Sequence, residues 1–113
     1  MKKIVIGMIF LLVSQIGLAQ DKKNKNARYD IEVNGNCEMC KKRIEKAAFS
    51  VKGVKSANWK IDDHKLRLII NEEKCSLHDV KTAIVKVGHD TDDLKASQED
   101  YDKLHGCCRY ERN

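Results

Sequence analysis

The chain contains no proline, and this absence bears on its one pair of closely spaced cysteines. Thiol–disulfide oxidoreductases with a thioredoxin-like fold normally place a cis-proline beside their C-x-x-C motif. A chain without proline therefore argues strongly against that class of redox protein.

Other functional signatures are also missing. The sequence has no Ser/His/Asp set, no paired-carboxylate site and no phosphate-binding loop, so we do not expect an enzyme. The strand-like run Leu66–Ile70 carries no aromatic residue, which argues against RNA binding by base stacking. The net charge of +5 is mild, and two of its units come from Lys2 and Lys3, so a nucleic-acid partner is not predicted.

The first residues have the pattern of a secretory signal peptide. Met1-Lys2-Lys3 is positively charged, residues 4–13 are mostly apolar, and Gly17-Leu18-Ala19 offers small residues to a signal peptidase. The apolar run is too short for a stable membrane-spanning helix. We expect cleavage after Ala19 and a periplasmic or secreted protein; an uncleaved N-terminal anchor is the alternative.

The rest of the chain is divided into three parts. Residues 20–27 are charged and polar and predict a short disordered lead-in. Residues 28–97 form one small domain, and residues 98–113 form a tail that contains cysteines.

Hydrophobic periodicity predicts the order strand, helix, strand, strand, helix, strand. The first helix covers residues 38–52. The second begins after the N-cap Ser76, with Asp79 three residues on as a partial capping box, and ends at Gly88. Leu66, Leu68 and Ile70 fall at alternate positions, as in a strand with one buried face. The strands cover residues 28–34, 54–62, 66–70 and, weakly, 91–97. This order predicts an α+β, ferredoxin-like βαββαβ sandwich in which two helices cover one face of a four-stranded antiparallel sheet.

Cys37 and Cys40 form a C-x-x-C motif where the first strand gives way to the first helix. The N-terminal end of a helix stabilises thiolates, and two soft sulfurs at this spacing can bind one thiophilic ion. A two-coordinate Cu(I) site needs no other ligand, whereas a structural zinc site needs two more. The spacing alone leaves metal capture, redox exchange and a structural pair open.

Several short motifs together resemble the heavy-metal-associated domain family. The resemblance covers about residues 31–90 and rests on Gly35-Asn36-Cys37-Glu38-Met39-Cys40, Ile44-Glu45-Lys46-Ala47, Gly53-Val54, Ala83-Ile84 and Gly88-His89-Asp90. The family includes copper chaperones, metal-binding domains of metal-pumping ATPases and periplasmic mercury-binding proteins. The resemblance identifies residues 28–97 as such a domain.

This resemblance implies an exported metallochaperone or scavenger. Cys37 and Cys40 would hold one soft ion, with Cu(I) favoured and Hg(II) or Zn(II) as alternatives, and would pass it on by ligand exchange. The implied partner is a metal-donor or metal-acceptor protein, such as a metal-transporting ATPase domain or a membrane transporter, and we expect a monomer. The alternatives are a periplasmic mercuric-ion binding protein and, with less support, a thiol–disulfide redox protein.

The chain departs from the family pattern at two positions. The metal loop is one residue shorter and lacks the methionine that usually anchors it, and Met39 is expected to pack or lie exposed rather than bind metal. His89 stands where the family usually has Tyr or Lys, so it is either a third ligand or a donor outside the ligand set.

The expected topology separates the remaining cysteines. Cys37 and Cys40 would share one end of the domain with His64 and His89, and Cys75 would lie at the opposite end. Cys107 and Cys108 have three interpretations: a second soft-metal donor pair with His105, a disulfide to Cys75, or plain exposed thiols. The basic run Lys41, Lys42, Arg43 and Lys46 is either a solvated face or a docking surface for an acidic partner domain.

Overall fold

The computed structural model describes residues 23–112. Its helices and strands, in chain order, are β1 (Ala27–Glu32), α2 (Glu38–Phe49), β2 (Val54–Trp59), β3 (Lys65–Ile70), α3 (Leu77–Lys86), α4 (Gln98–Asp102) and the 3-10 turn η1 (Gly106–Cys108). The predicted signal peptide, residues 1–19, lies outside the described residues.

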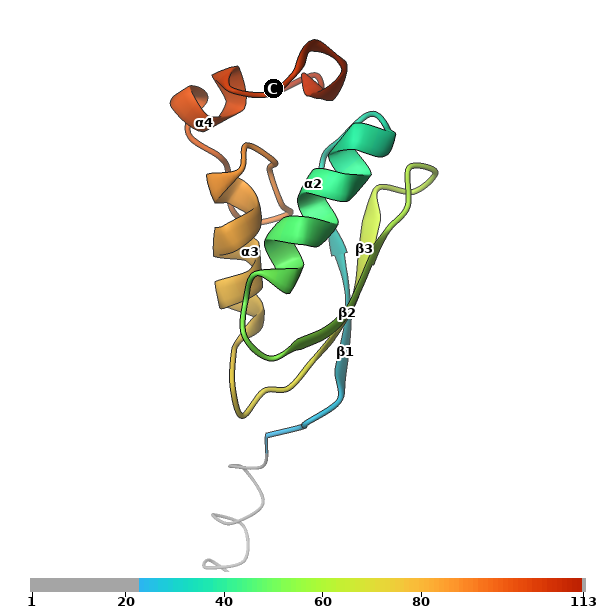
Figure 1. The fold of residues 1–113 in the computed structure, drawn as a ribbon, viewed down its shortest axis with the longest axis vertical. Coiled ribbons are helices and arrows are strands. Elements are labelled where there is room, and N and C mark those ends of the chain that lie inside the picture. Colours follow the sequence, from blue (N-terminus) through green and yellow to red (C-terminus); the bar gives the residue numbers. More distant parts are fainter. Residues whose placement is uncertain (1–22, 113) are drawn as a thin grey trace, which may run out of the picture.

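The three strands form one antiparallel sheet in the order β1-β3-β2, and α2 and α3 lie together on one side of it (Figure 1). The predicted alternation in β3 is confirmed, because Leu66, Leu68 and Ile70 are all fully buried. Trp59 and Ile44 complete the centre of the core from β2 and α2. The sequence therefore places its largest apolar side chains between the sheet and the helix pair.

The predicted fourth strand is absent from the described residues. In place of a strand over residues 91–97, one isolated bridge joins Val33 to Thr91. The Thr91 amide donates to the carbonyl of Leu94 at 2.8 Å, which closes a turn instead of extending the chain. Lys81 of α3 holds this turn through ion pairs of 3.0 Å with Asp92 and Asp93. The polar pairing of this segment with α3 thus replaces a strand ladder along β1.

The helix α3 has the predicted start and end, whereas α2 ends earlier than predicted. Ser76 accepts a hydrogen bond from the Asp79 amide, and Asp79 accepts one from the Ser76 amide, so the predicted capping box is present. Gly88 follows α3 with a φ of 101°, a conformation that favours glycine. The helix α2 ends at Phe49, three residues earlier than predicted.

The start of the domain also extends beyond the predicted boundary at residue 28. The strand β1 begins at Ala27, which is buried. Asn24 exchanges two hydrogen bonds with Glu72, at 2.9 and 3.1 Å. The described part of the predicted lead-in is therefore fixed against the end of β3.

The C-terminal segment lies across the end of the domain at which α2 begins (Figure 1). Tyr110 fixes it there: its hydroxyl donates to the Gly88 carbonyl at 2.8 Å and accepts from the Asp90 amide at 2.9 Å. Arg112 adds two hydrogen bonds of 3.0 Å to the Asp90 carboxylate. The prediction that a last strand carries the tail to the end of the domain near Cys75 is wrong, because no such strand forms.

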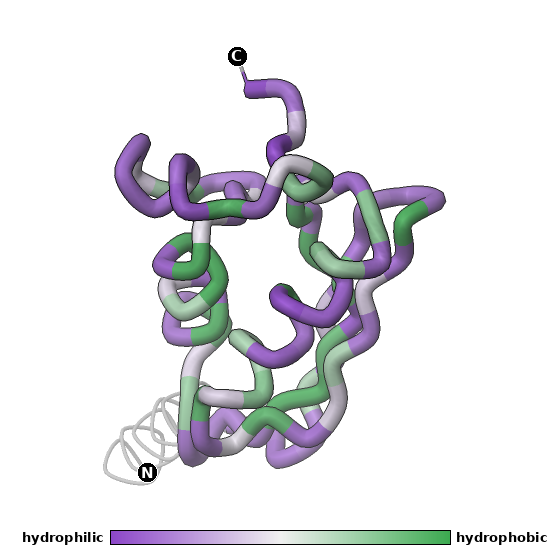
Figure 2. The backbone as a smooth tube through the Cα atoms, turned by 45° about the horizontal axis from the view of Figure 1, so that its top comes forward, coloured by the Kyte–Doolittle hydropathy of each residue, from purple (hydrophilic) through white to green (hydrophobic). Residues whose placement is uncertain are grey.

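Hydrophobic stretches along the described chain are short and alternate with hydrophilic ones (Figure 2). None of the helices within residues 23–112 has the length and apolar character needed to cross a membrane.

Candidate metal centre

Cys37 and Cys40 converge at the start of α2, as the sequence predicts. Cys37 is the N-cap residue, with an extended backbone, and Cys40 lies in the first turn of the helix. Their Sγ atoms are 3.4 Å apart. Cys40 is fully buried and Cys37 is half-buried, so the pair presents one inner and one outer sulfur.

The loop before this pair rests on Trp59. The indole Nε1 donates to the Val33 carbonyl at 3.0 Å, where the loop begins. A Cβ atom on Gly35 would lie 3.0 Å from Cys40 Cβ and 3.1 Å from the Trp59 ring, so only glycine fits without displacing a neighbour. The Asn36 amide is 3.3 Å from Cys40 Sγ. The contact of Trp59 with this loop joins residues 26 positions apart, and no local pattern in the sequence indicates it.

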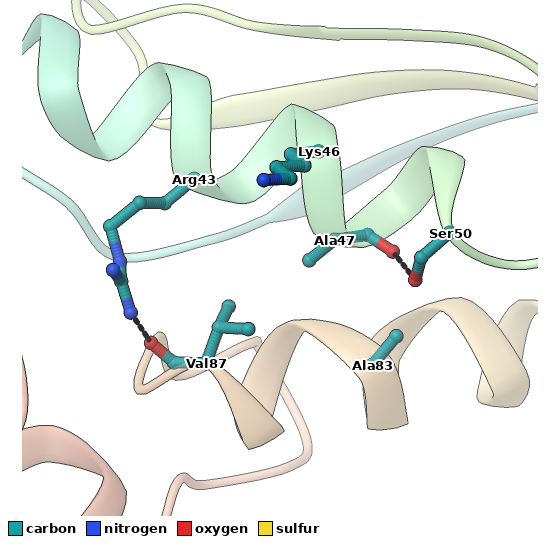
Figure 3. A pocket seen from close by; sticks show the side chains of 6 residues that line it. All are labelled: Arg43, Lys46, Ala47, Ser50, Ala83 and Val87. Atoms are coloured by element: carbon teal, nitrogen blue, oxygen red, sulfur yellow. Dashed lines mark hydrogen bonds between the residues drawn. The ribbon is translucent and has the colours of Figure 1, made fainter.

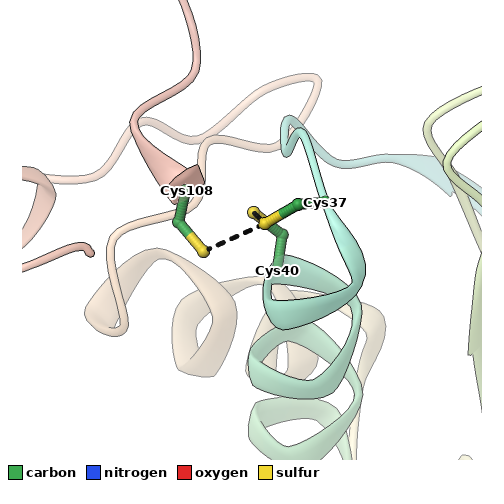
Figure 4. Close-up of side chains that lie close together, drawn as sticks. All are labelled: Cys37, Cys40 and Cys108. Atoms are coloured by element: carbon green, nitrogen blue, oxygen red, sulfur yellow. Dashed lines mark hydrogen bonds between the residues drawn. The ribbon is translucent and has the colours of Figure 1, made fainter. Parts of the chain in front are cut away.

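The tail brings two more sulfurs to this pair. Cys108 is fully buried, and its Sγ lies 3.6 Å from that of Cys37. The Sγ atoms of Cys37, Cys40 and Cys108 all lie within 4.8 Å of one another (Figure 4). Cys107 is exposed, with its Sγ 3.2 Å from Cys37 Sγ and 3.9 Å from Cys108 Sγ. The tail cysteines therefore lie beside Cys37 and Cys40 rather than in a separate pair with His105, and their role as metal donors stays a prediction.

Cys75 lies apart from this cluster. It is buried just before α3, its Sγ is 3.8 Å from the Asn71 carbonyl oxygen, and a Cβ on Gly53 would lie 3.0 Å from that sulfur. All five cysteines are free thiols. The hypothesis of a disulfide between Cys75 and the tail is therefore wrong for this arrangement, because the tail cysteines pack on Cys37 instead.

The thiols of Cys37, Cys107 and Cys108 differ in acidity. Burial acts to raise the pKa of Cys37, but hydrogen bonds from Cys107, from the backbone and side chain of Cys40 and from Cys108 lower it to about 7. Burial is the largest cause that raises the pKa of Cys108, and its hydrogen bonds with Cys40 and Cys37 raise that pKa further. Its hydrogen bond with Cys37 raises the pKa of Cys107. Of these three thiols, Cys37 therefore ionises at the lowest pH, and its thiolate is the form that binds a soft cation.

His89 contacts both the loop before Cys37 and the tail. Its ring is fully buried, Nδ1 lies 2.8 Å from the Asn34 carbonyl oxygen, and the ring stacks on Tyr110 at 5.7 Å between centroids. A carbonyl oxygen can only accept, so Nδ1 carries the proton. Burial lowers the pKa of His89 and keeps the ring neutral. His89 does not join the three-sulfur group; it connects the metal loop to the tail.

His64 and His105, which the sequence placed near the cysteines, lie outside the three-sulfur group. His64 stacks on the Trp59 ring at 5.9 Å between centroids, at the end of the β2–β3 hairpin. His105 is exposed and precedes η1 as its N-cap residue.

Two of the four basic residues on α2, Lys41 and Arg43, make hydrogen bonds within the domain. Lys41 Nζ donates to Glu45 at 2.6 Å and to the Trp59 carbonyl at 2.9 Å. Arg43 donates to the Val87 carbonyl at 2.9 Å, across a groove between α2 and α3 (Figure 3). Lys42 and Lys46 remain exposed on the helix surface. The docking hypothesis therefore rests on these two lysines.

Comparison with known proteins identifies a copper chaperone as a relative of this chain. No protein-family model matches the chain. The chain is 34% identical over 61 residues to the copper chaperone CopZ of Staphylococcus epidermidis. The matched stretch covers 53% of this chain and 90% of that protein.

Solved structures with the same fold include three instructive ones. A CopZ metallochaperone is 26% identical, with a TM-score of 0.56 over 57% of this chain and 98% of that chain. The N-terminal domain of a potential copper-translocating P-type ATPase from Bacillus subtilis, in its Cu(I)-loaded state, is 27% identical, with a TM-score of 0.57 over 72% of this chain and 98% of that one. Oxidized MerP from Ralstonia metallidurans CH34 is 18% identical, with a TM-score of 0.50 over 57% of this chain and 94% of its own, and shares the fold alone.

These similarities agree with the expectation that the chain is not an enzyme, because the similar proteins are metal carriers and metal-binding domains. They also agree with the motifs around Cys37 and Cys40 and with the sheet-and-helix-pair architecture. The chain therefore belongs to the heavy-metal-associated domain family.

Proposed function

We propose that this protein is an exported carrier of one soft metal ion, with Cu(I) as its main cargo. The observation that carries the proposal is the convergence of Cys37 and Cys40 at the start of α2, with their Sγ atoms 3.4 Å apart and Cys108 within reach of both. Among residues 23–112, the candidate ligand atoms that meet at this point are all sulfurs. Soft thiolates select Cu(I) and similar ions over hard cations.

The number of sulfurs favours a three-coordinate ion. With metal–sulfur bonds of about 2.3 Å, two sulfurs on a linear ion lie about 4.6 Å apart and sulfurs on a trigonal ion about 4.0 Å apart. The Sγ atom of Cys37 lies 3.4 Å from that of Cys40 and 3.6 Å from that of Cys108, so a trigonal ion fits with small movements. Cys108 thus acts as a third thiolate beside the pair that the motif provides.

The same donor set would accept Hg(II), which is the alternative cargo. Zn(II) fits less well, because structural zinc takes four ligands and Cys107 does not join the three-sulfur group. The names of the similar proteins with the strongest sequence agreement refer to copper, which favours Cu(I).

Transfer would proceed by ligand exchange with a partner thiolate. The incoming sulfur binds the ion, and one of the original metal–sulfur bonds then breaks. Cys108 suits the role of first leaving group, because the raised pKa of its thiol favours reprotonation once the ion departs. The oxidation state of the metal does not change. A partner of this kind is a metal-binding domain of a transporting ATPase or a membrane transporter, and one such ATPase domain shares this fold.

Export is part of the proposal and rests on residues 1–19. Their charged start, apolar run and small residues before position 20 support cleavage after Ala19. The intact mass of the protein recovered outside the cytoplasm tests this. A chain that begins at Gln20 is expected, and a chain that retains Met1 in the membrane fraction would contradict it.

The metal-binding part is tested by competition for Cu(I) between a chromogenic chelator and the reduced full chain. Cys37→Ser and Cys40→Ser should each lower the affinity at least 100-fold, or about 2.7 kcal/mol, because the remaining sulfurs cannot form the same site. Cys75→Ser is the matched control, since it also removes a thiol but lies outside the cluster. Native mass spectrometry with Cu(I), Hg(II) and Zn(II) identifies the preferred ion. Unchanged affinity in both loop variants would refute the proposal.

A further inference from the structure

Two sulfur-containing side chains, those of Cys107 and Met39, lie near the three-sulfur group without being part of it. Cys107 Sγ lies 3.7 Å from the Sδ atom of Met39 and 3.2 Å from Cys37 Sγ. Both Cys107 and Met39 are exposed, and Met39 keeps 45% of its surface accessible. They come from opposite ends of the described chain, 68 positions apart.

Core packing does not account for this arrangement. Met39 is one of two large apolar side chains that the described residues expose, and the other, Phe49, lies at the far end of α2. Cys107 contributes nothing to the core, because its side chain is exposed. The contact between them therefore stabilises little through burial, and it places two soft donors at the surface beside Cys37.

The position of Cys107 is nevertheless well defined. Cys108 follows it and is fully buried, and the Cys108 amide donates to the His105 carbonyl at 2.8 Å. Tyr110, two residues later, is fixed by hydrogen bonds to Gly88 and Asp90. Because the chain after Cys107 is held this firmly, the exposed thiol is presented to Cys37 and Met39 without a further ordering cost.

We propose that Cys107, Met39 and Cys37 form a second soft-metal site, open to solvent, so that the chain binds two Cu(I) ions with the Cys37 thiolate shared between them. This inference rests on the proposed function, because it takes Cys37 as a ligand of the inner ion. Thioether and thiolate sulfurs are both donors that Cu(I) prefers.

The distances suit this arrangement. Sulfurs on a trigonal ion with bonds of about 2.3 Å lie about 4.0 Å apart. The observed separations of 3.2 Å and 3.7 Å from Cys107 require only side-chain adjustment. Binding of the outer ion replaces the proton of the Cys107 thiol, which passes to the solvent as a Cu–S bond forms, and no electron is transferred. The net charge of the cluster is unchanged by this step.

The outer site would be the place where ions enter and leave. Cys40 and Cys108 have no accessible surface, so an incoming thiolate cannot reach them directly. Cys107 and Met39 are exposed, so a thiolate of a partner domain can reach an ion bound to them. A shared Cys37 sulfur then lets an ion move between the outer and inner positions while it always keeps at least one bond to the protein.

The test is the stoichiometry of Cu(I) bound to the monomer of the reduced full chain, measured by native mass spectrometry. The wild-type protein is expected to bind two ions. Cys107→Ser should bind one, and Met39→Leu should weaken the second ion about tenfold without affecting the first. Cys75→Ser and Phe49→Leu are matched controls, which remove a thiol and change an exposed apolar residue on α2 respectively, and both should still bind two ions.

The outcomes separate this inference from the proposed function. A wild-type monomer that saturates with one ion, or a Cys107→Ser variant that still binds two, would overturn the second site while the carrier function stands. A second ion seen only in a dimer would overturn it as well. A wild-type protein that binds no Cu(I) at all would refute both.

Discussion

The Sγ atoms of Cys37 and Cys108 lie 3.6 Å apart although 71 positions separate the two residues in the chain. This contact joins the metal loop to the tail, and it changes the donor set from a pair to a group of three (Figure 4). Under the proposed function, a partner that collects the ion has to displace a ligand from the same chain. The anchoring of the tail should control both the affinity for the ion and the rate of its release.

Tyr110 is the main anchor of the tail, and Tyr110→Phe should lower the stability of the metal-free protein by about 1–3 kcal/mol, because the buried Gly88 carbonyl and Asp90 amide both lose their partner. Urea unfolding of the reduced protein measures this. Tyr29→Phe is the control: its hydroxyl binds the partly exposed Glu72, so the expected loss is smaller. A Tyr110→Phe variant as stable as the wild type would show that the tail is not anchored in this way.

Gly88 is the second point at which the tail depends on α3. Gly88→Ala should destabilise the protein by about 1–3 kcal/mol, since a Cβ would lie 2.8 Å from the Asp100 carbonyl oxygen and the residue has a φ of 101°. Gly106→Ala is the matched control in the same tail, because a Cβ at Gly106 meets nothing within 4 Å. Thermal unfolding of both variants tests this. Equal melting temperatures would mean that the contact between Gly88 and α4 contributes no stability.

Cys37 should react with iodoacetamide at lower pH than Cys75, Cys107 and Cys108. Its pKa of about 7 means that the thiolate fraction rises from about one tenth at pH 6 to about nine tenths at pH 8. Burial raises the pKa of Cys75, so that thiol should stay unreactive over this range. Cys107→Ala removes a hydrogen-bond donor to Cys37 and should move its midpoint to higher pH.

The rate of labelling at each cysteine, followed by peptide mapping between pH 5.5 and 9, measures these midpoints. A Cys37 midpoint near that of an ordinary cysteine, about 8.5, would show that the neighbouring thiols do not stabilise its thiolate.

Local patterns predicted the parts of the fold that local forces determine. Alternation in Leu66, Leu68 and Ile70 identified β3, and the capping box at Ser76 and Asp79 identified the start of α3. The convergence of Cys37 and Cys40 followed from their spacing at a helix start. Each of these features depends on residues within a few positions of one another.

The tail could not be predicted in the same way, because its position depends on contacts between distant residues. Tyr110 reaches Gly88, 22 positions away, and no spacing rule connects the two. The predicted edge strand over residues 91–97 also led to the wrong position for the tail, because such a strand would carry the tail to the opposite end of the domain. The hydrogen bond from the Ala96 amide to Asp90 Oδ1, at 2.7 Å, is one of the interactions that keep this segment from becoming a strand.

The central claim is that Cys37, Cys40 and Cys108 hold the ion together. X-ray absorption at the copper edge of the protein with one equivalent of Cu(I) tests it most directly. The expected result is a first shell of three sulfurs at about 2.3 Å, which falls to two in a Cys107→Ser/Cys108→Ser variant. A shell of nitrogen or oxygen atoms, or a two-sulfur shell that is the same with and without the tail cysteines, would contradict the account.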